Sequence, residues 1–322
     1  MLEYSVALAT FNGSKYITEQ LISIINQTVP PSEIVISDDL SSDDTIVIAE
    51  TILCKSDINY KIIINKGTHG VSYNFYNAIS HTTYPIVFTS DQDDLWIENK
   101  AELMLKVYDL YPKAMLVFSD GELVNSKLES LNSSLWESVG ISKRKLTERK
   151  WFNYMLKKCM ITGSAMSFRR ELINKMPMIP KEWLHDGWIA WYAVAQKGLF
   201  PCNYKLFKYR QHEENVVGMR PRGSLSARLN VWINNMKFIQ STREIRKYRY
   251  ESLLSIMGEC FSESEKMKLK ECVSFWDTLC NLPISRIKKL GVITRLLLNG
   301  DYFKYYTGLR GYIRDVVLVF VA

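Results

Sequence analysis

Three carboxylates stand within four residues, at Asp91, Asp93 and Asp94, directly after the apolar, β-prone run 86–89. Such a cluster repels itself unless a positive charge lies within it. Hard divalent cations prefer oxygen ligands and often hold a phosphate on their far side. A solvated acidic turn is the simpler alternative, but open α/β sheets bind ligands at the carboxyl ends of their strands. The position of the cluster therefore favours a cation site.

Polar loops follow the two earlier strands as well. Thr10–Gly13 comes after the first strand, and its glycine lets the backbone approach a ligand, although a simple turn is the commoner reason for such a loop. In Ser37–Thr45, after the second strand, a carboxylate can accept a hydrogen bond from a base imide or a ribose hydroxyl. Alternatively, Ser41 or Ser42 caps the following helix. We expect both: the earlier residues bind and the later ones cap.

Two segments farther along add groups that can move protons or bind a metal. Asp186 lies among the aromatic residues of Trp183–Trp188, and a partly dry pocket raises a carboxyl pKa and suits the group to general-base work. A helix N-cap before 188–195 is the alternative. His212 lies in the polar string Tyr209–Gly218. A lone histidine is more often structural than a ligand, but this one can complete a metal site begun by two carboxylates.

Strand and helix signals alternate over residues 1–120, which indicates an α/β fold with a mostly parallel sheet buried on both faces. Residues 121–209 are less regular, and beyond Ser224 the pattern is helical. A cluster of Gly and Pro places a boundary near Gly218–Gly223. The predicted strands are 5–9, 33–37, 60–64, 86–89 and 114–118, and the predicted helices are 14–27, 42–53, 71–80, 96–108, 225–250, 251–260, 263–282 and 284–298.

The chain has 322 residues, of which 47% are hydrophobic and 23% charged, as is typical of a globular protein. Residues 1–120 carry 7 Lys and Arg against 16 Asp and Glu, a balance of −9. The remainder carries 34 against 18, a balance of +16. An acidic N-terminal part is therefore joined to a basic C-terminal part, whose surface can face nucleic acid, an anionic membrane or a phosphorylated substrate.

The cysteines and the apolar runs bear on location. The six cysteines form no CxxC pair, and buried reduced thiols in a cytosolic protein explain them most simply. Met1–Tyr4 lacks the basic leader of a signal peptide. No apolar run approaches the roughly 20 residues of a spanning helix. We therefore expect a cytoplasmic protein.

Taken together, these segments resemble the family 2 glycosyltransferases. The resemblance covers roughly residues 3–218 and rests on five motifs that appear in that family's order. The strings at 91–96 and 209–218 look most like the branch of rhamnosyltransferases and related O-antigen or capsule enzymes. The five motifs are Ala9-Thr10-Phe11-Asn12-Gly13, Ser37-Asp38-Asp39, Asn65-Lys66-Gly67, Asp91-Gln92-Asp93-Asp94-Leu95-Trp96 and His185-Asp186-Gly187-Trp188.

The resemblance implies a GT-A fold, in which a nucleotide-binding sheet merges with an acceptor-binding half. It implies a catalytic domain at 1–220, with parts 1–120 and 121–220, and a helical region at 221–322. Asp186 corresponds to the catalytic base, and Leu40 stands where the family usually has glycine. The implied nucleotide-sugar ligands are Thr10, Asn12, Asp38, Asp39, Lys66, Asp91 and Gln92. The implied metal ligands are Asp91, Asp93 and His212, with Asp93 binding directly and Asp91 acting more through the ribose or water.

The implied activity is transfer of one sugar, with inversion, from dTDP-L-rhamnose or a UDP-hexose to a glycan hydroxyl, assisted by Mg²⁺ or Mn²⁺. The expected acceptor is a lipid-diphosphate-linked intermediate in surface polysaccharide synthesis. The chain lacks the Gln-x-x-Arg-Trp string and the spanning helices typical of the family's processive synthases. The basic C-terminal region can rest on the inner face of an anionic membrane or form an ordinary packed subdomain or homodimer interface, and both alternatives stay open.

Two other function classes compete with this interpretation. A nucleotidyltransferase acting on sugar phosphates also has an α/β sheet, carboxylates and a metal, but it normally carries a Gly-rich, basic loop after the first strand, which Thr10–Ser14 is not. A nucleic-acid-binding protein would use the basic helices, but these show no recognised nucleic-acid motif and leave the carboxylates unexplained. We therefore expect a nucleotide-sugar donor and no nucleic acid.

Overall fold

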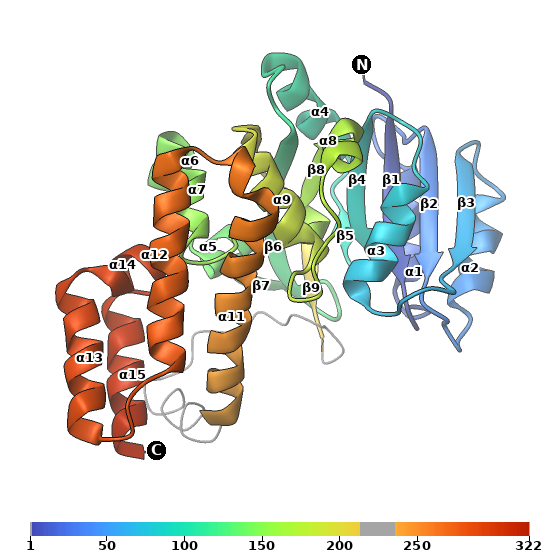
Figure 1. The fold of residues 1–322 in the computed structure, drawn as a ribbon. Coiled ribbons are helices and arrows are strands. Elements are labelled where there is room, and N and C mark those ends of the chain that lie inside the picture. The colour runs from blue at the N-terminus through green and yellow to red at the C-terminus, as the bar shows by residue number, and fades with distance from the viewer. Residues whose placement is uncertain (1, 213–235, 322) are drawn as a thin grey trace. The chain divides into compact units, whose positions relative to one another are not determined.

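The computed structural model describes residues 2–212 and 236–321, which fall into two compact units, one α/β and one helical (Figure 1). The sequence placed two short segments of the helical unit in the catalytic domain, and it placed a boundary near Gly218–Gly223, which lies outside the described residues. The α/β unit comprises residues 2–149, 160–179 and 183–212, and the helical unit comprises residues 150–159, 180–182 and 236–321.

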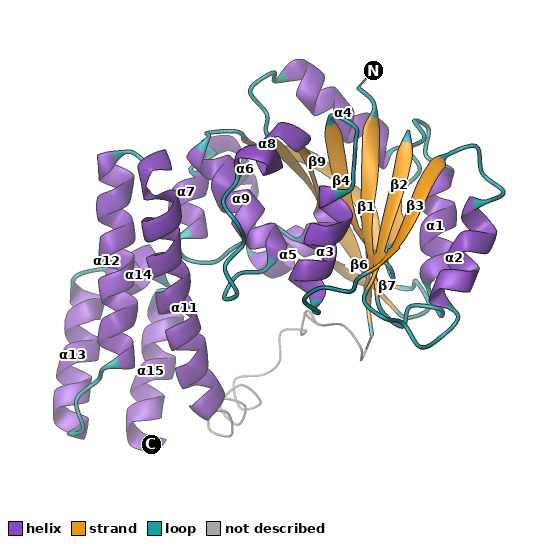
Figure 2. Ribbon diagram, turned by 45° about the vertical axis from the view of Figure 1, so that its right-hand side comes forward, coloured by secondary structure: helices purple, strands orange, loops and turns teal. Residues whose placement is uncertain are grey.

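Within the described residues, a nine-stranded sheet organises the α/β unit in the order β3-β2-β1-β4-β8-β6-β9-β5, with β7 beside β6 (Figure 2). The first four strands in the chain are parallel, and their register aligns Thr10 with Asp38 and Ala9 with Asp91. Their carboxyl ends therefore meet at one edge, where the predicted site residues follow. These strands are β1 (Tyr4–Thr10), β2 (Glu33–Asp38), β3 (Asn59–Ile64) and β4 (Ile86–Asp91).

The other half of the sheet is mixed. β8 runs antiparallel to both β4 and β6, whereas β9 runs parallel to β6. The expectation of a mostly parallel sheet is therefore met by β1 to β4 rather than by the whole sheet. The predicted strand 114–118 continues to Asn125 because β9 pairs with it along this length. The strands are β5 (Leu95–Trp96), β6 (Leu116–Asn125), β7 (Ser130–Ser134), β8 (Met166–Arg169) and β9 (Leu199–Gln211).

Amphipathic helices pack on this sheet. α1 (Ile17–Ile25) buries Ile17, Leu21 and Ile24, the spacing that predicted it. α2 (Thr45–Leu53) begins three residues later than predicted, because Ser41 and Ser42 bond to earlier residues instead of capping it. The remaining helices of the unit are α3 (Val71–Ser80), α4 (Lys100–Leu110), α5 (Leu135–Val139), α6 (Lys143–Glu148), η1 (Gly163–Ala165), α8 (Arg170–Lys175) and α9 (His185–Ala195).

The helical unit is held by an apolar core and a buried ion pair. Arg243 Nη2 lies 3.0 Å from Asp315 Oδ1, and Tyr302 donates to Asp315 Oδ2 at 2.9 Å. The two predicted helices 225–250 and 251–260 are one helix in its described part. The elements are α7 (Trp151–Met155), α11 (Met236–Met257), η2 (Gly258–Cys260), α12 (Glu263–Cys280), α13 (Arg286–Leu298), α14 (Asp301–Tyr305) and α15 (Leu309–Val321).

Two expectations from composition meet the structure here. None of the helices in residues 2–212 and 236–321 combines the length and the apolar character that a membrane crossing requires. No disulfide links the cysteines in the described residues, but the cysteines are not all buried: Cys54 is exposed, whereas Cys202 and Cys272 lie in the cores of their units.

Candidate active site

The carboxylates of Asp91, Asp93 and Asp94, called here the acidic cluster, lie in one crowded site after β4. Asp94 is fully buried; its Oδ1 accepts a 3.2 Å hydrogen bond from Arg210 N, and its Oδ2 has no hydrogen-bond partner in the described part of the chain. Burial, then repulsion from Asp93 and Asp91, raises the pKa of Asp94 well above its usual value. Burial, Asp93 and Asp186 likewise raise the pKa of Asp91 to about 7. The site therefore holds more negative charge than its surroundings neutralise.

Arg210 fastens the acidic cluster to α1, a role that the sequence did not reveal. Its side chain is buried; Nε donates to Asp93 O and Nη1 donates to Ser126 O, each at 2.7 Å. The guanidinium also pairs with Glu19 on α1. Its place in the polar string 209–218 was the only sequence signal, because the partners lie in three distant segments.

The structure brings Asp93 and His212 into contact, with His212 Nε2 2.7 Å from Asp93 Oδ2 and both side chains largely buried. Carboxylate oxygen and imidazole nitrogen suit Mn²⁺, and the uncompensated charge of the acidic cluster favours a cation, so these residues fit the predicted ion. In residues 2–212 and 236–321, no three His, Cys, Asp or Glu side chains converge as a complete metal site. Substrate phosphates and water are the usual source of the remaining ligands.

Gln92 shapes the loop after β1. Phe11 N donates to Gln92 Oε1, and Gln92 Nε2 donates to Phe11 O, each at 2.9 Å. Gly13 makes room for this amide, because a Cβ at residue 13 would lie 2.2 Å from Gln92 Oε1. The protein thus uses both ends of the Gln92 side chain, which was predicted to contact the donor. Asn12, held at φ 48°, accepts a hydrogen bond from Ser42 N at 2.8 Å.

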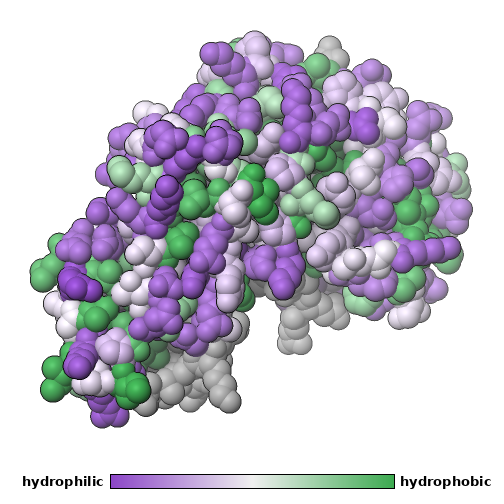
Figure 3. All heavy atoms as spheres, viewed as in Figure 1, coloured by the Kyte–Doolittle hydropathy of each residue, from purple (hydrophilic) through white to green (hydrophobic). Residues whose placement is uncertain are grey.

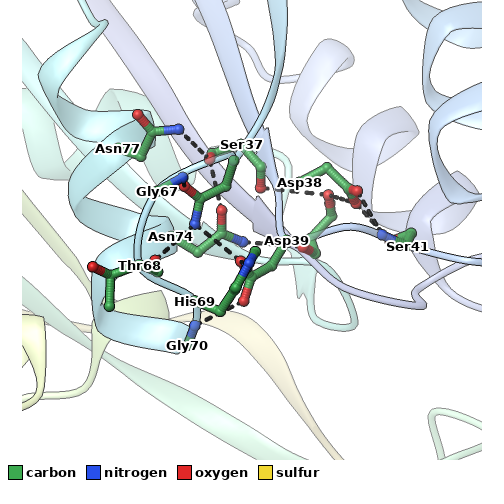
Figure 4. A network of polar contacts seen from close by, with 12 residues as sticks. Ser37, Asp38, Asp39, Ser41, Gly67, Thr68, His69, Gly70, Asn74 and Asn77 are labelled. Atoms are coloured by element: carbon green, nitrogen blue, oxygen red, sulfur yellow. Dashed lines mark hydrogen bonds and ion pairs between the residues drawn. The ribbon is translucent and has the colours of Figure 1, made fainter.

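Thr10 and Asp38 are both buried and bonded to each other, although both were predicted to be donor ligands. Thr10 Oγ1 donates to Asp38 Oδ2 at 2.7 Å. Ser41 donates twice to the same carboxylate, from N at 2.7 Å and from Oγ at 2.6 Å (Figure 4). Asp38 therefore ties the ends of β1 and β2 to the loop that follows.

The side chain of Asp39 bonds instead to the loop after β3. Gly70 N donates to Asp39 Oδ2 at 2.8 Å, and Asn65 Nδ2 donates to Asp39 Oδ1 at 2.9 Å. His69 Nδ1 lies 2.7 Å from the same Oδ1 (Figure 4). Burial raises the pKa of Asp39, but these hydrogen bonds outweigh it and lower the pKa overall. Asp39 is therefore ionised at neutral pH.

The neighbouring loops place two more predicted residues. Leu40 has φ 66°, the left-handed conformation that favours glycine, and its side chain is exposed. The turn thus adopts this conformation with leucine in place of the glycine that the resemblance implied. Lys66 is exposed in the loop between β3 and α3.

Asp186 lies in the first turn of α9, whose N-cap is Leu184 rather than the aspartate. Its Oδ1 accepts from Gly187 N at 2.6 Å, and its Oδ2 accepts from Gly163 N at 3.2 Å. Its charge helps to raise the pKa of Asp91, so the two carboxylates act on each other electrostatically. The predicted base therefore lies beside the acidic cluster.

Two buried groups near Asp186 were not predicted. Lys100 Nζ donates to Ser164 O at 2.7 Å and lies 4.1 Å from the centroid of the Trp96 ring. Burial lowers the pKa of Lys100 to about 7, although the charges of Asp94 and Asp91 oppose this shift. His185 stacks on Phe75 with ring centroids 4.0 Å apart, and burial lowers the pKa of His185 to about 3, which keeps it neutral.

Residues 5–176 match the family model described as Glycosyl transferase family 2. The chain belongs to glycosyl transferase family 2. Within the family, the dTDP-rhamnosyl transferase RfbG of Shigella flexneri is 30% identical over 225 residues, which are 66% of this chain and 73% of RfbG. The Escherichia coli UDP-Glc:alpha-D-GlcNAc-diphosphoundecaprenol beta-1,3-glucosyltransferase WfgD is 23% identical over 217 residues, 66% of this chain and 78% of WfgD. The family predicted from the motifs is confirmed.

A solved structure shows how the fold of this family 2 enzyme compares. Residues 1–349 of TarS from Staphylococcus aureus, crystallised with UDP-GlcNAc, match it with a TM-score of 0.61 at 14% identity. The match covers 99% of this chain and 90% of the TarS chain. The predicted GT-A type of fold and the helical C-terminal region are both confirmed.

Proposed function

We propose that this glycosyltransferase transfers one hexose, with inversion, from a nucleotide-sugar donor to a glycan hydroxyl and that it uses a divalent cation. The observation that carries the proposal is that Asp91, the last residue of β4, interacts electrostatically with both Asp186 and Asp93, and that Asp93 contacts His212. An inverting displacement needs one base and no protein nucleophile, and Asp186 is the proposed base.

The loops after β1, β2 and β3 form the proposed nucleoside site. Asp39 is ionised and can accept a hydrogen bond from a base imide or a ribose hydroxyl, and Asn12 lies on the adjoining loop. The exposed ammonium of Lys66 suits a diphosphate. Thr10, Asp38 and Gln92 act through these loops, because their polar atoms bond to the protein. Thr10 donates to Asp38, Asp38 accepts from Ser41, and Gln92 accepts from Phe11 N.

Asp93 and His212 are the proposed protein ligands of Mg²⁺ or Mn²⁺, with Asp91 acting through water or the ribose. When bound, such an ion neutralises the charge that builds on the leaving nucleoside diphosphate. Arg210 holds the backbone of Asp93 and so keeps its carboxylate at the strand edge.

Asp186 takes the proton of the acceptor hydroxyl as that oxygen bonds to the anomeric carbon and the bond to the diphosphate breaks. The N–H groups of Gly163 and Gly187 hold its two oxygens. The N-terminal turn of α9 also favours the carboxylate form that a base requires.

Replacing Asp186 with Asn tests this role. The Asp186→Asn enzyme should lose about 10²- to 10⁴-fold in transfer rate, while Mn²⁺-dependent binding of UDP or dTDP, measured by calorimetry, should persist. Asp109→Asn, a change at an exposed acid on α4, is the matched control and should leave the rate unchanged. Transfer at the wild-type rate by Asp186→Asn would refute the base assignment.

The names of the relatives support a donor and an acceptor class. RfbG is a dTDP-rhamnosyl transferase, and WfgD carries UDP-Glc and a diphosphoundecaprenol-linked sugar in its name. We infer that the donor is dTDP-L-rhamnose or a UDP-hexose and that the acceptor is lipid-diphosphate-linked, which would place the enzyme at the cytoplasmic face of the membrane. A thermal-shift screen of nucleotide sugars with and without Mn²⁺ identifies the donor, because a ligand bound only by the folded state stabilises it.

The helical unit offers a surface for an anionic membrane where α13 begins and α15 ends (Figure 1). Ile284, Ile287 and Phe320 are 97%, 83% and 60% exposed. Arg286 and Lys288 are exposed beside them, and α13 contains no acidic residue. Cations in the first turn of a helix interact unfavourably with the helix dipole, so anionic headgroups bound there would offset this repulsion. Figure 3 shows apolar and hydrophilic residues side by side at this end of α13.

Vesicle sedimentation tests this surface. The wild-type enzyme should bind phosphatidylglycerol vesicles and release them at high salt, and the double variant Ile284→Glu, Ile287→Glu should lose this binding. Met267→Glu, a change at an exposed apolar residue of α12, is the control that should keep it. Loss of a homodimer in the double variant, with no vesicle binding by the wild type, would instead assign the surface to a second copy of the chain.

A further inference from the structure

The short turn η1 (Gly163–Ala165) lies at the centre of the contacts around Asp186. Three of its backbone groups bond to side chains from three separate elements. Thr89 Oγ1 on β4 donates to Gly163 O at 2.6 Å, and Lys100 Nζ on α4 donates to Ser164 O at 2.7 Å. Gly163 N donates to Asp186 Oδ2 at 3.2 Å. The turn therefore connects the strand that ends in the acidic cluster with the carboxylate on α9.

The side chains that donate hydrogen bonds to the turn are buried rather than exposed. Thr89 and Lys100 are fully buried. A buried ammonium is costly unless it is bonded, and Lys100 Nζ lies between the Trp96 and Phe207 rings, 4.1 and 4.7 Å from their centroids. Its ammonium donates a hydrogen bond to Ser164 O. This arrangement fixes the turn against the sheet.

Residue 163 also has to be glycine. A Cβ there would lie 2.8 Å from His185 Nε2 and 3.9 Å from Asp186 Cβ. The His185 ring cannot move aside easily, because it is buried and stacked on Phe75. Any added atom at residue 163 would therefore press on the segment that carries Asp186.

We propose that the Gly163–Ala165 turn is a positioning element for the catalytic carboxylate: Thr89 and Lys100 fix the turn, and Gly163 N sets the orientation of Asp186. This inference rests on the proposed role of Asp186 as the base. A fixed N–H on one carboxylate oxygen limits rotation of the group, so that its lone pairs keep one direction relative to the donor site. Gly163, Thr89 and Lys100 are positioning residues, since none of them is required to touch the substrate.

The turn can be tested at two independent points. Gly163→Ala should lower kcat by about 10²-fold, as misplacement of a reacting group by about 1 Å does, while UDP or dTDP binding with Mn²⁺ stays unchanged. Thr89→Val keeps the side-chain size but removes the hydroxyl, and it should lower kcat by a smaller factor. Thr89→Ser restores the hydroxyl and should recover most of that loss. The rate is measured as nucleoside diphosphate release from dTDP-L-rhamnose or UDP-glucose.

Gly198→Ala is the matched control, because a Cβ there would lie 2.5 Å from Met115 Cγ, away from the acidic cluster. It should lower the melting temperature without a selective loss of kcat. The proposal is overturned if Gly163→Ala and Thr89→Val keep the wild-type kcat, or if kcat and nucleotide binding fall together. Asp186→Asn, assayed in parallel, separates the two levels: an active Asp186→Asn enzyme refutes the base, whereas an inactive one beside active turn variants refutes only the positioning role.

Discussion

Two groups of acids occupy the same edge of the sheet, on either side of β1. Asp38, Asp39 and Asp43 follow β2, and the acidic cluster follows β4. In the β2 group, the protein supplies hydrogen-bond donors to every carboxylate. Burial raises the pKa of Asp39 and of Asp43, but the hydrogen bonds outweigh this effect. The pKa of Asp39 is therefore lowered, and that of Asp43 is lowered to about 2. In the acidic cluster, burial and mutual repulsion raise the pKa of Asp91 and Asp94.

The difference separates a structural framework from the proposed metal site. Donors placed by the chain make the β2 group stable as negative charge, so its acids strengthen the folded loops. The acidic cluster also has donors, Arg210 N among them, but burial and mutual repulsion outweigh them, and this cost must be offset by folding elsewhere. An added cation would relieve it. The same residue type therefore acts as a structural clamp at Asp38 and Asp43 and as a proposed metal ligand in the acidic cluster.

The largest contrast is expected in catalysis. Asp93→Ala removes the proposed cation ligand and should reduce kcat/KM by at least about 10²-fold, as loss of metal stabilisation worth several kcal/mol does. Donor binding should no longer depend on Mn²⁺ in calorimetry. Asp43→Ala, the corresponding change in the β2 group, should cost far less activity. Equal losses of kcat/KM in Asp93→Ala and Asp43→Ala would contradict the different roles proposed for the two groups of acids.

The two groups should also respond to pH in opposite senses. The folded-state pKa of Asp91 is raised from 3.8 to about 7, so the unfolded chain loses this proton first and the contribution of Asp91 to stability falls as pH rises through that interval. Asp43 is lowered from 3.8 to about 2, so its contribution is present above about pH 4 and is lost as pH falls towards 2. Urea unfolding in EDTA should show a smaller loss of stability between pH 5 and 7 in Asp91→Asn.

A change within the β2 group should affect folding more than binding. Asp38→Asn weakens charge-assisted hydrogen bonds to Thr10 and Ser41 and should destabilise the protein by about 1.5–3 kcal/mol. Binding of UDP or dTDP should remain close to wild type when both are measured well below the melting temperature. Weaker nucleotide binding with unchanged stability would indicate that Asp38 contacts the donor directly, as the resemblance implied.

The smallest expected effect concerns Leu40, whose left-handed backbone costs roughly 1–2 kcal/mol for a residue with a Cβ. Leu40→Gly relieves this strain, less the extra entropy that glycine loses on folding, and should stabilise the protein by up to about 1 kcal/mol. Val47→Gly, at an exposed position inside α2, should instead destabilise by about 1 kcal/mol. Thermal melting compares the two; a destabilised Leu40→Gly would mean that the leucine side chain makes a contact worth more than the strain.

The strands β1 to β4 and the order of the site loops could be predicted from the sequence, because apolar periodicity is a local signal and each motif follows a strand end. The partners of each carboxylate could not. Asp38 and Asp39 are adjacent, yet one is held by Thr10 and the other by His69, through contacts that only the tertiary fold creates. The predicted N-cap of α2 was wrong for the same reason, because the Ser41 hydroxyl donates its hydrogen bond to Asp38 instead.

Arg210 has a consequence for how the enzyme is made. Its guanidinium pairs with Glu19, 191 positions earlier, and bonds to the backbone of Asp93 and Ser126. A ribosome releases the chain from its N-terminus, so the early strands emerge long before this arginine does. The loop that carries Asp93 and Asp94 therefore stays unfastened in a nascent chain until β9 has been synthesised, and a chain truncated before β9 should fold its first strands without assembling the proposed site.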